Sequence, residues 1–286
     1  MMLCAGHLRG LILATAGVVV LSPDALILRL VEIDRWSILF WRGLLTGVAL
    51  TAVFAAGYRR DLLDHLKAMG RPGLLAALLF AITSILFVSA ITLTSVANAL
   101  VIVSAAPLFA AILSFVFLHE HIALRTWVAV IVGFLGMTII FSGSLAGGAL
   151  LGDLCAVGTA CFLAANFTVV RHARAINMVP AVALSGFIVA VVVFPLAAPL
   201  LTEARDFMLL SLLGLVILPL SMGLIMQAPR YLPAAEVSLI MLLEAILGPL
   251  WVWLMLGEIP GSPTFVGGGL VLATLIAHAL LGLRRA

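Results

Sequence analysis

The longest uncharged stretch of the sequence constrains the fold more than any other feature. From Pro72 to Leu118 there is no Asp, Glu, Lys or Arg. This run is too long for one buried helix of a soluble protein, and it accommodates two membrane spans, because one span needs about 20 apolar residues. Comparable runs occupy residues 126–152, 175–202, 207–229 and 259–283. The protein therefore acts in or across a membrane.

The composition excludes several other classes. Hydrophobic residues make up 65% of the chain and charged residues 9%, whereas a soluble domain has about 25% charged residues. The net charge is +3, but the basic residues lie in short connections without clustering beside aromatic residues, so we expect no nucleic-acid partner. The sequence has no phosphate-binding Gly-Lys loop, His-Glu-x-x-His pair or nucleophile elbow. We therefore expect no cofactor, no metal and no enzymatic activity, and keep a membrane enzyme or receptor as a remote alternative.

The spans are predicted to be α-helices. Within lipid, each backbone N–H and C=O must be paired inside a helix or a closed barrel, and the runs lack the apolar/polar alternation of barrel strands. The predicted fold class is an all-α integral membrane protein with ten transmembrane helices. We place them at about residues 8–29, 36–57, 72–93, 96–118, 125–142, 150–170, 180–201, 207–228, 235–256 and 264–283.

The distribution of basic residues predicts the orientation. Since cytoplasmic loops carry an excess of Lys and Arg, the side of the membrane with more of them is expected to be cytoplasmic. The opposite side holds Arg29, Arg35 and Arg205, while Arg42 lies within the second span. The other eleven basic residues share a side with both termini: Arg9, Arg59, Arg60, Lys67, Arg71, Arg125, Arg171, Arg174, Arg230, Arg284 and Arg285. Both termini are therefore predicted to be cytoplasmic.

A pattern repeats at an offset of 138 residues. The fourth span ends in Leu118-His119-Glu120 and the ninth in Leu256-Gly257-Glu258. The ten spans are therefore expected to form two sets of five, one in residues 1–148 and the other in residues 149–286. Five is an odd number of crossings, so the second half is inverted relative to the first. Inverted repeats of this kind place a pathway at their interface and permit alternating access.

These features resemble a known family. The motifs are Phe40-Trp41-Arg42 in the second span, Ser104-Ala105-Ala106-Pro107-Leu108-Phe109 in the fourth, and the two endings in Glu120 and Glu258. Together with the 5+5 layout, they resemble the drug/metabolite transporter superfamily in its EamA-type branch. In size and layout the chain is similar to the YddG-type amino-acid exporters. The resemblance implies a multi-pass transporter of the bacterial inner membrane.

The ninth span departs from the family pattern. The mid-helix proline usual in that branch would fall at Ala245, whereas this chain has Pro249 and an unusual Glu244 before it. A charged group inside the bilayer is costly, at about 2.5–3.5 kcal/mol on insertion scales, so each is a functional candidate. Glu244 is the leading candidate, to meet a substrate ammonium or to take up a proton. The structural alternative is a neutral or hydrogen-bonded group that packs against a neighbouring helix.

Further candidates follow from the pseudo-symmetry. Asn98 and Glu236 share the offset of 138, and Asp24 and Asn166 are 142 residues apart, so the members of each pair are expected near opposite mouths of one pathway. Phe162 lies on the same helix face as Asn166. Two alternatives remain open: Asp24 caps an irregularity at Pro23, and Asn166 joins helices by hydrogen bonding.

The remaining candidates complete the set. Gln227 and Ser84 are weaker substrate-binding candidates, so that the predicted binding residues are Asn98, Asn166, Gln227, Glu244, Ser84 and Phe162. Arg42 is expected either to pair with an acidic residue (Asp24, Glu32 or Asp34) or to extend toward the interface. The residues assigned to gating or to structural polar roles are Asp24, Arg42, Glu236, Pro107, Pro249, Glu120 and Glu258.

The sequence thus predicts a secondary exporter of small metabolites, with amino acids as the favoured class. Proton-coupled efflux of cationic drugs is the alternative. The expected partners are a small-molecule substrate and the lipid bilayer, and the oligomeric state, monomer or homodimer, is left open.

Overall fold

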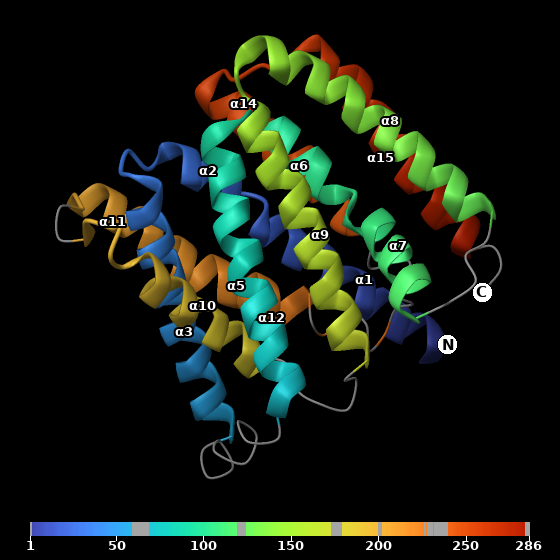
Figure 1. Cartoon of the computed structure of the whole chain (residues 1–286). Coiled ribbons are helices and arrows are strands. Elements are labelled where there is room, and N and C mark those ends of the chain that lie inside the picture. Colours follow the sequence, from blue (N-terminus) through green and yellow to red (C-terminus); the bar gives the residue numbers. More distant parts are fainter. Residues whose placement is uncertain are drawn as a thin grey trace.

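The helices form one bundle, and no strand occurs in the part of the chain that is described (Figure 1). The structure, a computed structural model, describes residues 2–58, 69–118, 124–172, 179–199, 202–225, 227, 231 and 240–283. α1 begins and α15 ends at the same end of the bundle, which we call the terminal end. The opposite end is the far end. The helices are α1 (Met2–Leu21), α2 (Asp24–Leu30), α3 (Arg35–Tyr58), α5 (Gly70–Leu93), α6 (Val96–Ser104), α7 (Ala106–Leu118), α8 (Leu124–Gly147), α9 (Leu150–His172), α10 (Val179–Val193), α11 (Ala204–Ser211), the π-helix η2 (Leu212–Ile217), α12 (Leu218–Ile225), α14 (Glu244–Leu256) and α15 (Ser262–Leu283).

Among the described residues, seven helical segments are long and apolar enough to cross a bilayer, as expected of a multi-pass helical membrane protein. They are His7–Leu30, Arg35–Ala56, Gly70–Leu93, Val96–Leu113, Thr126–Ser144, Leu150–Val169 and Ala204–Ile225. The other three expected spans coincide with shorter apolar helices at Pro180–Val193, Glu244–Leu256 and Ser262–His278.

The first segment is interrupted at Ser22-Pro23, between α1 and α2. Proline has no N–H to donate to the carbonyl four residues earlier, which here belongs to Val19. The Ser22 hydroxyl donates to that carbonyl instead, at 2.9 Å. The chain therefore bends directly before Asp24, while the Val19 carbonyl keeps a hydrogen-bond partner in the Ser22 side chain.

The fourth and ninth segments are interrupted at equivalent places. The fourth breaks at Ala105, between α6 and α7, directly before Pro107. The ninth has a turn at Leu242-Leu243, and α14 then continues through Pro249. Ala105 and Leu243 are separated by the offset of 138. The ninth segment is therefore interrupted just before Glu244, and not at Pro249.

Close helix crossings join the two halves of the chain. A Cβ atom on Gly186 of α10 would lie 2.5 Å from the carbonyl oxygen of Gly43 of α3, and one on Gly136 of α8 would lie 2.8 Å from that of Gly267 of α15. Glycine is thus required for these backbones to approach. α5 also packs against α9, α1 against α12, and α6 against α14.

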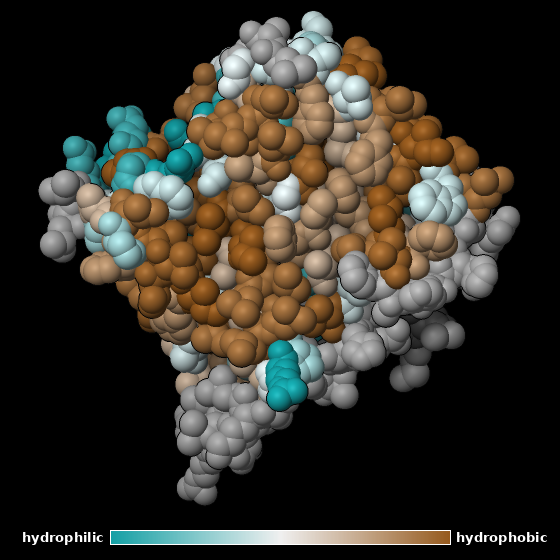
Figure 2. All heavy atoms as spheres, in the orientation of Figure 1, coloured by the Kyte–Doolittle hydropathy of each residue, from teal (hydrophilic) through white to brown (hydrophobic). Residues whose placement is uncertain are grey.

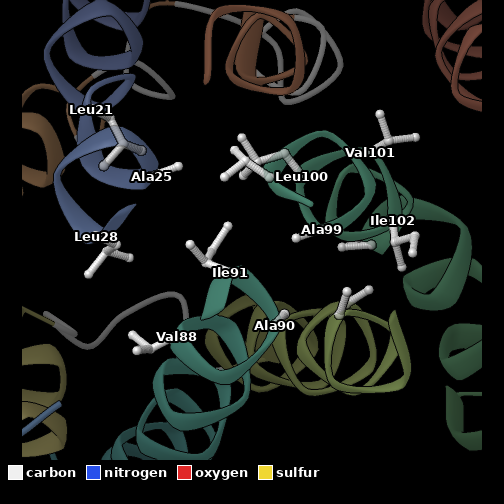
Figure 3. Close-up of a cluster of buried hydrophobic side chains, with 14 of the residues drawn as sticks. Leu21, Ala25, Leu28, Val88, Ala90, Ile91, Ala99, Leu100, Val101 and Ile102 are labelled. Carbon is white, nitrogen blue, oxygen red and sulfur yellow. The ribbon is translucent and has the colours of Figure 1, made fainter. Parts of the chain in front are cut away.

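The core lies where α1, α2, α5 and α6 meet. Leu21 and Leu28 face Val88 and Ile91 of α5, while Leu100 approaches from α6 (Figure 3). The face of the bundle shown in Figure 2 is largely apolar where it is coloured, with hydrophilic residues gathered toward its ends. Such a surface is the one that lipid requires of a spanning bundle.

Candidate functional site

An ion pair between Asp24 and Arg42 is buried inside the bundle. Arg42 Nη2 lies 2.7 Å from Asp24 Oδ2, with side-chain exposures of 12% for Arg42 and 5% for Asp24. Asp24 is the first residue of α2, and Arg42 lies in α3. Of the three acidic partners considered for Arg42, the structure therefore selects Asp24. A charge at this depth requires such a partner.

Arg42 also joins a third helix. Its Nη1 donates to the Ser84 hydroxyl of α5 at 3.1 Å, and its guanidinium lies 5.7 Å from the centre of the Phe87 ring. The arrangement leaves two atoms of the ion pair unused. Arg42 Nε and Asp24 Oδ1 are buried and have no hydrogen-bond partner among the described residues.

Glu244 adds a second carboxylate to this site. It is partly buried at the first turn of α14 and lies within electrostatic range of both Asp24 and Arg42. Two turns further along α14, Trp251 Nε1 donates to the Ser22 hydroxyl at 2.9 Å. Ser22 therefore both completes the bend before Asp24 and anchors α14 beside it.

The site lies well inside the far ends of its helices. Asp24 precedes the far end of its helix by six residues and Glu244 by twelve. At about 1.5 Å per residue, these positions lie roughly 9–18 Å from the far end. Since the hydrocarbon core is about 30 Å thick, the site reaches from the far half to about the midplane. We call Asp24, Arg42, Ser84 and Glu244 the central site.

A second polar group lies at the far end of the bundle. Arg29 Nη2 donates to the Thr94 carbonyl at 2.7 Å and lies 3.4 Å from Glu258 Oε1. The same oxygen of Glu258 accepts from the backbone N–H of Val96 at 3.2 Å. Glu258, which lies two residues after the end of α14, therefore contacts both α2 and the start of α6.

Asn98 belongs to a separate buried cluster at the far end. Its amide nitrogen donates to Ser144 at 2.9 Å and lies 3.4 Å from Asp153 Oδ1, and its oxygen accepts from Thr264 at 2.5 Å. Asp153 Oδ1 also accepts from Thr94 at 2.6 Å. These bonds link the ends of α5, α6, α8, α9 and α15. The structure thus does not bring Asn98 to the central site.

The other candidates are dispersed. Asn166 is fully buried and donates to the Ala76 carbonyl of α5 at 2.8 Å, with Phe162 half-buried one turn earlier on α9. Gln227 is exposed and donates to the Gly223 carbonyl at 2.9 Å. Pro107 is exposed at the start of α7. Glu120 and Glu236 lie outside the described residues.

Sequence reasoning did not select Arg29, Thr94 or Asp153. Arg29 had been counted only for orientation, and Asp153 lies at the edge of a span, where a charged residue is ordinary. The available signal was the position of Asp153 in the first turn of a helix, where a carboxylate is favourable. Its contacts with Thr94 and Asn98 depend on residues more than fifty positions away.

Comparison with known proteins agrees with this architecture. Residues 8–142 and 150–278 each match the EamA-like transporter family. A solved structure described only as "Crystal structure of protein" is similar over 98% of this chain and 100% of its own, with a TM-score of 0.67 and 16% sequence identity, which shows a shared fold. A search of curated proteins gave no match.

Proposed function

Since the chain belongs to the EamA-like transporter family, we propose that it exports small metabolites, with amino acids as the favoured class, by secondary transport. The family moves small solutes across membranes, and this chain is a multi-pass helical protein. The similarity in size and layout to the YddG-type exporters supports the choice of amino acids. A central site that offers both acidic and basic groups suits a substrate with two charges.

The observation that carries the proposal is the composition of the central site. Its side chains come from α2, α3 and α5 in the first part of the chain and from α14 in the second. Ionisable groups inside the bilayer are costly, and they mark substrate or ion pathways. A structural ion pair would need no further carboxylate, whereas Glu244 lies within range of both of its members.

The proposed architecture is two inverted repeats of five helices each, residues 1–148 and 149–286. The two family matches fall on either side of this boundary. The helix contacts also agree with two repeats related by pseudo-symmetry. If each helix is replaced by its counterpart in the other repeat, the contact between α5 and α9 corresponds to the contact between α12 and α1. The contacts α3–α10, α6–α14 and α8–α15 each join two counterparts directly. The helix interruptions at Ala105 and Leu243 are also at equivalent positions of the two repeats, since they are 138 residues apart.

The proposed transport cycle is alternating access. The contacts of Glu258 with Arg29 and Val96 close the far end, so a substrate at the central site leaves there only when α2, α6 and α14 separate. The excess of basic residues favours a cytoplasmic terminal end. We therefore propose uptake from the cytoplasm and release across the bacterial inner membrane.

Counterflow in proteoliposomes tests the function. Vesicles that contain the purified protein and one unlabelled amino acid are diluted into a trace of the same labelled amino acid, for each of the twenty amino acids. We expect transient accumulation of at least one of them, without ATP. Accumulation of none would overturn amino-acid export, and protein-free vesicles measure leakage.

The alternative is proton-coupled efflux of lipophilic cations. Its supporting observation is that two carboxylates, Asp24 and Glu244, lie close to a single guanidinium. A cation such as tetraphenylphosphonium that moves in exchange for protons, in vesicles where no amino acid accumulates, would favour this alternative.

A further inference from the structure

We propose that the Asp24–Arg42 ion pair is the recognition element for a zwitterion, with the substrate ammonium on Asp24 and the substrate carboxylate on Arg42. This inference rests on the proposed function and assigns the substrate class of the central site. From the sequence alone, both residues are assigned gating or structural roles.

The hydrogen-bonding capacity that remains at the ion pair points to this substrate. A guanidinium has five N–H donors in a fixed plane, and a carboxylate accepts through both oxygens. Arg42 uses Nη2 for Asp24 and Nη1 for Ser84, while Asp24 uses Oδ2 for Arg42. Arg42 Nε and Asp24 Oδ1 lack partners among the described residues. One donor and one acceptor thus remain in the same buried place.

A zwitterion satisfies both atoms, because it carries an acceptor and a donor at its two ends. A carboxylate accepts from Arg42 Nε, in the planar geometry that guanidinium groups favour. An ammonium donates to Asp24 Oδ1, with Glu244 nearby as a second carboxylate. A simple cation leaves the Arg42 donor without a partner, and a simple anion meets two carboxylates with one guanidinium.

The geometry also separates this site from the other polar groups. Buried atoms without a partner among the described residues also occur at Arg29 Nε, Asp153 Oδ2 and Asn166 Oδ1. Within that part of the chain, however, only the Asp24–Arg42 pair leaves both a donor and an acceptor in one ion pair. Arg205 and Glu32 form an ion pair at 3.5 Å, but their side chains are 59% and 79% exposed, so water satisfies them. The Asp24–Arg42 pair is buried, and a buried donor or acceptor without a partner is costly, which favours a bound group that pairs with both atoms.

The first test uses the wild-type protein and two blocked analogues. The labelled amino acid is the one that accumulates most in counterflow. Its unlabelled form, its methyl ester and its N-acetyl derivative are then compared as competitors. The ester lacks the carboxylate and the acetyl derivative lacks the ammonium. We expect the half-inhibitory concentration of each analogue to be at least ten times that of the free amino acid.

Variants assign the two ends of the substrate. Arg42→Gln leaves two carboxylates without a guanidinium, so the preference for the free amino acid over the methyl ester should fall at least tenfold. Asp24→Asn should lower the preference over the N-acetyl derivative by a similar factor. If a single variant fails to fold, the double variant Asp24→Asn/Arg42→Gln removes both charges in similar volumes and should lose both preferences. The matched control, Glu32→Gln/Arg205→Gln, should keep the wild-type ratios.

The outcomes separate the inference from the proposed function. If amino acids exchange but both analogues compete as well as the free form, the inference is wrong and the export function stands. Unchanged ratios in the folded double variant would likewise overturn the inference alone. Absence of any amino-acid exchange would overturn the proposed function and the inference with it.

Discussion

Arg29 and Glu258 are 229 residues apart in the sequence, and their side chains meet 3.4 Å apart at the far end of the bundle. Glu258 also accepts from the backbone N–H of Val96. Because Val96 begins α6 and Glu258 follows α14, this carboxylate joins the far ends of these two helices, which pack against each other. In the proposed transport cycle, these contacts separate before the substrate leaves at the far end.

Glu258→Gln should therefore open the far end more often. The amide keeps one hydrogen bond to Val96 but loses the charge that attracts Arg29. A partly exposed pair of this kind contributes about 0.5–1 kcal/mol, which corresponds to a two- to fivefold shift. The measurement is the reaction rate of Ala97→Cys, in a background without the native cysteines, with an impermeant thiol reagent. Glu32→Gln is the control, and equal rates in both variants would contradict the role of Glu258.

Glu244→Gln should lower transport at least tenfold or abolish its pH dependence. The substitution keeps the volume and much of the hydrogen bonding of a neutral acid while it removes the ability to carry charge. Counterflow between about pH 5.5 and 8 provides the measurement, with Glu203→Gln, at the exposed start of the eighth segment, as control. Wild-type transport across this range would exclude Glu244 from the transport cycle.

Asn98→Ala should destabilise the fold without changing substrate affinity. The substitution leaves the groups of Ser144 and Thr264 without their amide partner, and each buried unsatisfied group costs about 1–3 kcal/mol. The thermal midpoint in detergent and the half-saturating substrate concentration are measured together. Ser142→Ala is the control, since that exposed hydroxyl bonds only its own helix, at Ile139. A changed affinity with an unchanged midpoint would instead place Asn98 in substrate binding.

Gly186→Ala should prevent the close crossing of α3 and α10. The added Cβ would lie 2.5 Å from a backbone oxygen of Gly43, so the helices must separate, at a cost of about 1–3 kcal/mol or more. The yield of folded protein and its thermal midpoint give the readout. Gly223→Ala is the matched control because its Cβ would meet nothing within 4 Å, and an equal response of the two variants would contradict the crossing.

The proposed orientation predicts the side of the membrane from which a thiol reagent reaches each end of the bundle. In the same cysteine-free background, Arg71→Cys should react with an impermeant reagent only from the cytoplasmic side, and Glu203→Cys only from outside. Both residues are exposed, at opposite ends of the bundle. The reverse pattern of labelling would invert the proposed direction of export.

The sequence by itself determined the membrane class and the approximate positions of the helices. Lipid offers no hydrogen bonds to the backbone, so each apolar run has to satisfy its own backbone groups, and its length is sufficient to locate it. The bend at Pro23 is local for the same reason, because a proline and a serine within one turn decide which donor reaches the Val19 carbonyl.

Only the tertiary structure decided which polar groups meet. Arg42 had three possible acidic partners within eighteen residues, and the packing of α2 against α5 and α3 selected Asp24 and Ser84. Asn98, Asn166 and Glu244 look alike in the sequence as polar residues in apolar spans, yet they lie in three separate environments. Helix–helix packing in a membrane depends on small residues such as Gly43 and Gly186, whose partners are distant in the chain. The rotation of each helix, and with it the set of side chains that shares a site, is therefore a property of the assembled bundle.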